Sequence, residues 1–113
     1  MGTLIRGGTV VTASDVMSAD VLIEGEVVTA IAHHIESQDH EVVDAGGCYL
    51  FPGGVDPHTH LDMPFGGTTT ADDFRTGTMA AAFGGTTTII DFALHSKGDT
   101  LQNAIRTWHH KAA

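Results

Sequence analysis

The spacing of hydrophobic residues changes near Pro52. Before this residue, short β-branched runs alternate with Gly, Asp and Glu, which is typical of strands joined by turns. The runs cover residues 3–6, 9–12, 20–24, 27–32, 41–44 and 48–51, and glycine-containing turns are expected at 7–8, 25–26 and 45–47. Residues 1–51 are therefore predicted to form an antiparallel β module.

After Pro52, the pattern changes to strand, loop, helix, strand and helix. The expected elements are a strand at 55–60, a loop at 61–70, a helix at 74–83 that ends at Gly84-Gly85, a strand at 86–92 and a helix after Asp99. The strand at 86–92 is almost free of charge, as a buried parallel strand should be. This alternation indicates the opening of an α/β wound fold or barrel.

The starts of both helices have capping signals. Thr70 offers an N-cap hydroxyl, with Asp73 three residues later, and Asp99 stands in the same relation to Gln102. One face of the second helix is apolar, and its members are Leu101, Ile105 and Trp108. We expect Trp108 to pack in the core on this face.

Length and charge restrict the classes of partner. At 113 residues the chain has room for one small domain or parts of two. Its formal charge of −9 repels phosphate backbones and anionic lipids, so we expect neither nucleic acid nor membrane as a partner.

No secretory signal or 18-residue apolar run is found, and Cys48 is the only cysteine. We expect a cytoplasmic protein in which Cys48 is a buried structural thiol.

Two histidines, His58 and His60, carry the strongest chemical signal. They lie at the carboxyl end of the predicted strand, and side chains at i and i+2 of a strand share a face, so both imidazoles could bind one metal ion. Ordinary surface or core histidines are the alternative. Asp56, on the same strand face, either orients a ligand or accepts from backbone donors. In the acidic stretch before residue 52, we expect His33, His34 and His40 to be solvated.

The longer motif around this pair resembles one family of enzymes. It comprises Pro52 to Phe65 (PGGVDPHTHLDMPF), Thr68 to Phe74, and Phe83 to Phe92. These segments resemble the N-terminal quarter of D-hydantoinases and dihydropyrimidinases, which are metal-dependent cyclic amidohydrolases of the amidohydrolase superfamily. The resemblance implies that residues 1–51 are part of a β-sandwich domain and that 52–113 begin a (β/α)8 barrel.

The same resemblance implies a metal site and a substrate. His58 and His60 match two zinc ligands of a two-metal centre, in which a metal-bound hydroxide attacks a ring amide carbonyl; another divalent metal such as manganese is possible. Met63 and Phe65 match a loop that contacts the substituent on the ring, although simple packing of that loop is equally open. The implied substrate is a small cyclic amide, such as a 5-substituted hydantoin or a dihydropyrimidine. The implied assembly of the full-length parent is a homotetramer.

The chain also departs from the family pattern. It ends at Ala113, before the family's bridging lysine, two further histidines and catalytic aspartate, so no catalytic residue is identified within it. We expect Lys97 and Lys111 to be solvated. Asp62 stands where dihydroorotases have an arginine for a carboxylate substrate, which favours a neutral ring. The chain alone is expected to be inactive, and a non-catalytic fragment or interaction module is the alternative function.

Overall fold

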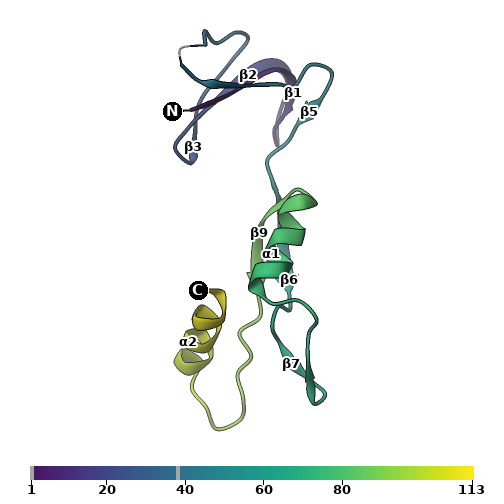
Figure 1. The fold of residues 1–113 in the computed structure, drawn as a ribbon, viewed down its shortest axis with the longest axis vertical. Helices are drawn as coiled ribbons and strands as arrows, with labels where there is room; N and C mark the ends of the chain where they lie inside the picture. The colour runs from purple at the N-terminus through teal and green to yellow at the C-terminus, as the bar shows by residue number, and fades with distance from the viewer. Residues whose placement is uncertain (1, 38) are drawn as a thin grey trace. The chain divides into compact units, whose positions relative to one another are not determined.

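The computed structural model describes residues 2–37 and 39–113. The chain divides into two compact units, Met1–Pro52 and Gly53–Ala113 (Figure 1). The boundary lies at the proline where the hydrophobic pattern changes. Among the described residues, the first unit contains strands and no helix, and the second contains strands and two helices.

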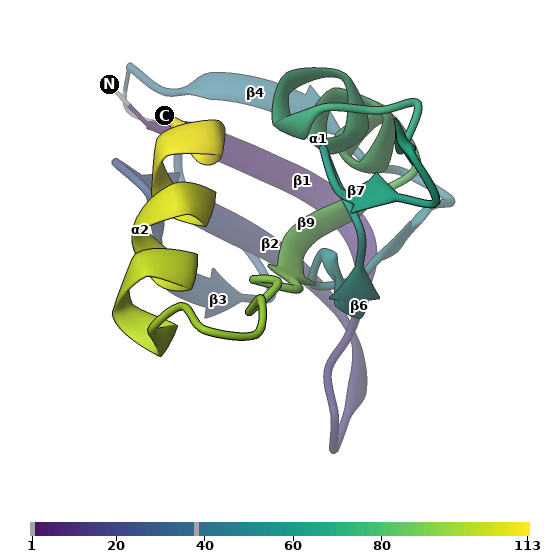
Figure 2. The ribbon, with the colours of Figure 1, turned by 90° about the horizontal axis from the view of Figure 1, so that it is seen from below.

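The first unit is a mixed sheet. Its strands are β1 (Thr3–Val11), β2 (Val16–Glu24), β3 (Val27–Ala32), β4 (Glu41–Asp44) and β5 (Tyr49–Leu50). The main order is β3-β2-β1-β4, and Figure 2 shows these four strands side by side. The β1–β2 and β2–β3 pairs are antiparallel, and the side chains of Val10, Ala19 and Val21 form the buried core cluster.

The prediction of a purely antiparallel module was wrong for the last two strands of the unit. Both β4 and β5 run parallel to β1. Strand β3 ends at Ala32, whereas β4 begins beside the start of β1, where Glu41 donates its backbone N–H to the carbonyl of Gly2 at 3.0 Å. A connection that returns the chain in this way produces a parallel strand, whereas the short apolar runs alone do not reveal strand direction.

The predicted turn at Gly7-Gly8 is a bulge inside one continuous strand. The register of β1 against β2 shifts between Ile5 and Gly8, and Gly7 has a φ of 74°. The Gly7 N–H donates to Asp20 Oδ1 at 2.9 Å. A strand of this length can continue because glycine tolerates the left-handed conformation that the bulge requires.

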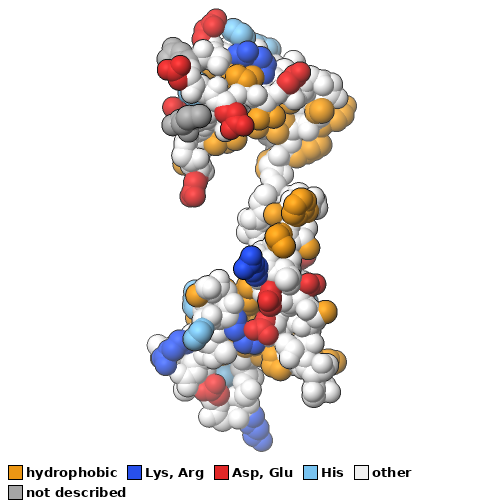
Figure 3. Space-filling view, viewed as in Figure 1, with side chains coloured by type: hydrophobic (Ala, Val, Ile, Leu, Met, Phe, Trp, Pro, Cys, Tyr) orange, Lys and Arg blue, Asp and Glu red, His pale blue; other side chains and the backbone are white. Residues whose placement is uncertain are grey.

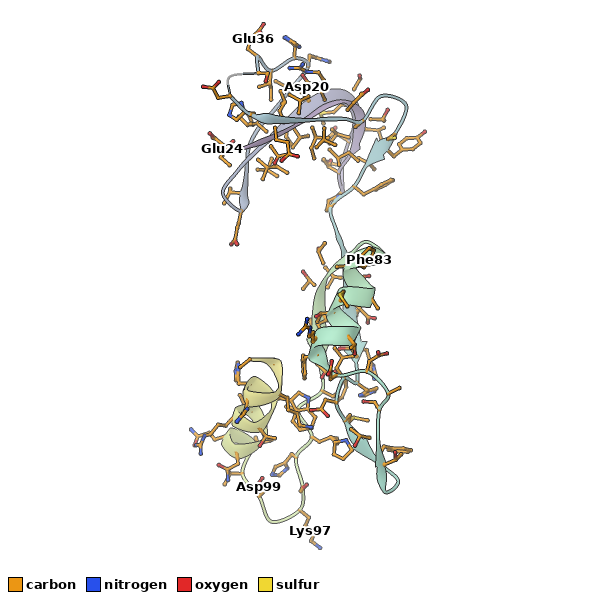
Figure 4. The ribbon with its side chains drawn as sticks, in the orientation of Figure 1. Asp20, Glu24, Glu36, Phe83, Lys97 and Asp99 are labelled. Carbon is orange, nitrogen blue, oxygen red and sulfur yellow. The ribbon has the colours of Figure 1, made fainter. Side chains whose placement is uncertain are left out.

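The carboxylate of Asp20 holds two distant segments together. The residue is 3% exposed, and its second oxygen accepts from the backbone N–H of Ile35 at 3.0 Å. Arg6 Nε and His34 Nδ1 lie 3.9 and 3.6 Å from the same oxygen. His34 is exposed, as predicted, although it lies beside this carboxylate. In Figure 4, Asp20 lies close to the segment that carries Glu36.

Two further predictions for this unit were wrong. Cys48 is exposed, because it lies in the turn between β4 and β5, at the edge of the sheet. The side chain of His40 is only 16% exposed, and its Nε2 lies 3.9 Å from Glu24 Oε1. The exposure of both residues depends on where their segments lie relative to the strands of the sheet, which neighbours in sequence do not reveal.

The second unit contains a strand–helix–strand element followed by another helix. Its elements are β6 (Gly54–Thr59), β7 (Pro64–Phe65), β8 (Thr68–Thr69), α1 (Phe74–Phe83), β9 (Thr86–Asp91) and α2 (Leu101–Ala112). Strands β6 and β9 pair in parallel, α1 packs against β9, and α2 contacts α1. The predicted order of strand, helix, strand and helix is thus confirmed. Neither helix combines the length and apolar composition needed to cross a membrane.

The connections of this unit differ from prediction in detail. The loop at 61–70 contains the β7–β8 hairpin, whose turn residues Gly66 and Gly67 have φ values of 59° and 84°. Helix α1 is capped by Asp73, which accepts from Thr76 N at 2.7 Å, rather than by Thr70. Helix α2 is capped by Thr100 rather than Asp99, and both cap predictions are therefore wrong by one to three positions.

Apolar side chains of the second unit remain exposed. Trp108 of α2 is buried as expected, and Ala104 is buried as well, but Ile105 and Leu101 are 52% and 69% exposed. Ile90 of β9 is 56% exposed, so the expected burial of this strand is not complete within the chain. Apolar side chains also appear on the surface of both units in Figure 3. A parallel strand pair normally has cover on both faces.

We predict that Asp20 stabilises the first unit more at neutral than at acid pH. The hydrogen bonds from Gly7 and Ile35 lower the pKa of the Asp20 carboxyl, with smaller contributions from Arg6 and His34. The stabilisation should therefore be present above the unfolded-state pKa of about 3.9 and be lost as the pH falls through the lower folded-state value. Asp20→Asn should lower the urea midpoint of the full-length protein at pH 7, and by less below pH 4. Asp44→Asn, at an exposed aspartate, is the control. An equal loss at both pH values would contradict the prediction.

Candidate metal site

His58 and His60 converge at the end of β6. Their Nε2 atoms lie 3.0 Å apart, and their rings meet edge to face with centroids separated by 4.9 Å. Both residues are exposed. The strand geometry explains the convergence, because side chains two residues apart lie on the same face.

The ring of Phe92 packs against both imidazoles. Its centroid lies 4.6 Å from that of His58 and 5.1 Å from that of His60. Phe92 follows β9 directly, and its backbone N–H donates to the carbonyl of Thr59 at 3.3 Å. The sequence placed this residue in a strand without relating it to the histidines; the parallel pairing of β6 and β9 brings them together.

Asp91 is the residue near the site that sequence reasoning missed. Its carboxylate accepts from Thr59 Oγ1 at 3.0 Å, from Leu61 N at 3.1 and 3.3 Å, and from Trp108 Nε1 at 3.1 Å. A signal was present in the sequence, since Asp91 is the one charged residue of an otherwise β-branched strand. The carboxyl ends of parallel neighbours meet at one sheet edge, so this aspartate had to lie near the histidines.

The predicted neighbours of the pair have simpler roles in the structure. Asp56 Oδ1 accepts from the backbone N–H of His58 at 3.1 Å, so its observed bond is to the backbone rather than to an imidazole. Met63 is half-buried, and its N–H donates to Thr70 Oγ1 at 2.9 Å. Phe65 lies on the β7–β8 hairpin and is 74% exposed.

The two lysines differ from each other. Lys97 is exposed, as predicted, and points outward from its loop in Figure 4. Lys111 is not solvated: its Nζ donates to the carbonyl of Asp62, lies 3.5 Å from Asp62 Oδ2 and sits 4.6 Å from the centroid of the Trp108 ring. The error arose because the partners of Lys111 are distant in sequence. This contact also partly compensates the charge of Asp62, which weakens the argument that Asp62 repels anionic substrates.

The two imidazoles have the right chemistry for a metal ion such as zinc. Imidazole nitrogen is a common zinc ligand, and two such ligands of a tetrahedral ion with Zn–N bonds of about 2.0–2.1 Å lie about 3.3 Å apart, close to the observed separation. The described residues contain no group of three or more His, Cys, Asp or Glu side chains that could hold a metal ion. His58 and His60 therefore form a pair of donors that needs further ligands.

Comparison with known proteins places this geometry in context. The chain is 61% identical over 112 residues to D-hydantoinase of Geobacillus stearothermophilus, covering 99% of this chain and 24% of that protein. It is 46% identical over 110 residues to dihydropyrimidinase of Rattus norvegicus, covering 93% of this chain and 21% of the relative. No family model matches the chain.

Solved structures agree with the sequence comparison. The crystal structure of dihydropyrimidinase from Brevibacillus agri has a TM-score of 0.95 and 66% identity, covering 98% of this chain and 24% of that one. The chain belongs to the D-hydantoinase and dihydropyrimidinase family. This confirms the resemblance inferred from the motif. The chain spans about a quarter of the length of the curated relatives that it matches.

Within the D-hydantoinase and dihydropyrimidinase family, the framework is preserved at lower identity. L-Hydantoinase from Arthrobacter aurescens has a TM-score of 0.78 at 26% identity, covering 97% of this chain and 24% of that one. The backbone is thus retained while most side chains differ.

We predict that Lys111 restrains the segment that follows His60. Lys111→Met should remove the bond to the Asp62 carbonyl while keeping an apolar stem beside Trp108. Loss of about 1 kcal/mol of local stability should speed hydrogen exchange around residues 61–63 by about 5-fold in the full-length protein. Lys97→Met is the control, at an exposed lysine of the same unit. Equal exchange rates in the two variants would show that the Lys111 contact contributes nothing.

Proposed function

We propose that the full-length protein carrying this chain hydrolyses the cyclic amide bond of 5-substituted hydantoins or dihydropyrimidines. The observation that supports this most directly is the convergence of His58 and His60 at the carboxyl end of β6. It occurs in a chain that is 61% identical to a D-hydantoinase. Metal-dependent hydrolases of barrel type place their sites at the carboxyl ends of strands.

The two units are proposed to be parts of larger domains. The β6–α1–β9–α2 segment would be the first two β/α units of a barrel, and the mixed sheet of residues 1–51 would be part of a β-sandwich domain. Two features support this proposal. The β6–β9 pair is parallel, with a helix as its connection, and apolar side chains such as Ile90 remain exposed for further cover.

The metal is proposed to be zinc, with manganese as an alternative divalent ion. His58 and His60 would hold one of two ions, and the remaining ligands and the proton carrier would lie outside the described segment. When bound, such an ion supplies a Lewis acid and a water molecule of lowered pKa. Phe92 keeps one side of both imidazoles apolar. The Thr59 hydroxyl and the Leu61 backbone N–H, on the two sides of His60, are both bonded to Asp91.

The substrate is proposed to be a small neutral ring, and the full-length protein is proposed to act as a homotetramer. Met63 and Phe65 follow β6, the strand that leads to the two histidines, and lie on the loop that contains the β7–β8 hairpin. An exposed aromatic side chain on such a loop is suited to an apolar ring substituent rather than to the amide under attack.

The histidine assignment predicts loss of bound metal. In the full-length protein, His58→Ala and His60→Ala should each lower bound metal below two ions per subunit and abolish turnover, because each removes one of few ligands. Elemental analysis of the purified variants measures this. His33→Ala, which removes an exposed histidine of the first unit, should retain wild-type metal. Full metal content and unchanged turnover in the His58 and His60 variants would refute the proposal.

The loop assignment predicts a change in selectivity without loss of metal. Phe65→Ala should change the ratio of kcat/KM for 5-aryl and 5-methyl hydantoins by about 10- to 200-fold, the range that one or two methylene-sized contacts provide. Phe83→Ala is the matched control. Phe83 is also an exposed phenylalanine, at 91%, but it is the last residue of α1 and precedes β9 rather than lying on the β7–β8 hairpin (Figure 4). If both kcat/KM values fall together after Phe65→Ala, the residue serves to pack its loop.

A further inference from the structure

The carboxylate of Asp91 is bonded on both sides of a histidine. One oxygen accepts from Thr59 Oγ1 at 3.0 Å, and the backbone N–H of Leu61 lies 3.1 and 3.3 Å from the two oxygens. Thr59 and Leu61 are the residues immediately before and after His60. The residues on both sides of His60 are therefore held by one side chain from another strand, Thr59 through its hydroxyl and Leu61 through its backbone N–H.

A third donor holds the carboxylate itself in place. Trp108 Nε1 donates to Asp91 Oδ2 at 3.1 Å, and the Trp108 side chain is buried. Trp108 lies on α2, so the carboxylate joins β6, β9 and α2. Because its oxygens are occupied by N–H and O–H donors, Asp91 is placed to restrain the histidines rather than to bind a metal ion.

The residue after Asp91 acts on the imidazole rings. Phe92 packs within 4.6 and 5.1 Å of the His58 and His60 centroids, and its N–H donates to the Thr59 carbonyl at 3.3 Å. Backbone and ring positions at the pair are thus both set from the end of β9. A shift of the Asp91 carboxylate would therefore move Thr59 and Leu61, which flank His60, together with the ring of Phe92.

We propose that Asp91 is a positioning residue for the His58–His60 pair, and that its bonds to Thr59 and Leu61 determine the affinity and geometry with which the pair holds its metal ion. This inference rests on the proposed function. It assigns to Asp91 a role that differs from general stabilisation of the fold. General stabilisation would change the unfolding midpoint alone, whereas positioning would also change the metal centre.

The test uses the full-length protein loaded with cobalt(II), whose visible absorption reports ligand geometry. Asp91→Ala should weaken metal affinity by about 10- to 100-fold, as loss of a bond that orients a ligand does elsewhere, and should change the spectrum. The matched control is Asp73→Ala. Asp73 makes bonds to the backbone and side chain of Thr76 at the start of α1 and none to β6, so this variant should lower stability while the affinity and spectrum remain unchanged.

A second variant covers the case in which Asp91→Ala does not fold. Asp91→Asn keeps one oxygen for Thr59 and Leu61 but turns an amide donor toward the Trp108 N–H. We expect an intermediate loss of affinity, and partial recovery when Trp108→Phe is added to remove the opposing donor. Wild-type affinity and spectrum in every Asp91 variant that folds would overturn the inference.

The histidine variants distinguish failure of the proposed function from failure of the role assigned to Asp91. If His58→Ala and His60→Ala retain full metal affinity, the proposed function fails, and the inference fails with it. If they lose the metal while Asp91→Asn and Asp91→Ala keep wild-type affinity and spectrum, the proposed function stands and only the role of Asp91 is refuted.

Discussion

One carboxylate, that of Asp91, connects the end of β6, where the two histidines lie, with β9 and α2. It accepts from a side chain of β6, from the backbone just beyond β6 and from an indole of α2. Without this acceptor, the Leu61 N–H and the Trp108 N–H would lose the partners that the structure gives them. Unpartnered buried donors are costly, so the strand end, the histidines and the helix depend on the same side chain.

The first unit also contains a carboxylate that accepts hydrogen bonds from distant segments, but there it holds the sheet together rather than the histidine pair. Asp20 is buried, and its two oxygens accept from Gly7 and Ile35, which belong to a bulge and to the connection after β3. In both units an aspartate on one strand holds backbone that a regular sheet would leave without a partner. A buried carboxylate is tolerated when hydrogen bonds and nearby cations compensate its charge, as Arg6 does here.

Features that depend on local pattern could be predicted from the sequence. The helix at 74–83 and the strand at 27–32 were predicted with the bounds that the structure shows, because spacing of apolar residues and a terminal glycine pair specify them. The His-x-His geometry follows in the same way from strand periodicity. The errors at Gly7-Gly8, Cys48 and Lys111 share one cause: each depends on a partner distant in sequence, which periodicity does not encode. Asp91 was missed for this reason too.

The parallel pairing of β6 with β9 also sets an order in time. Asp91 lies 32 residues after Thr59, and Trp108 lies a further 17 residues along the chain. At a synthesis rate of about 5–20 residues per second, the histidines leave the ribosome about 2–6 s before the carboxylate that fixes the backbone around them. The side chain that restrains the residues around His60 is therefore made only after the second strand, so this restraint can form only once the β6–α1–β9 element is complete.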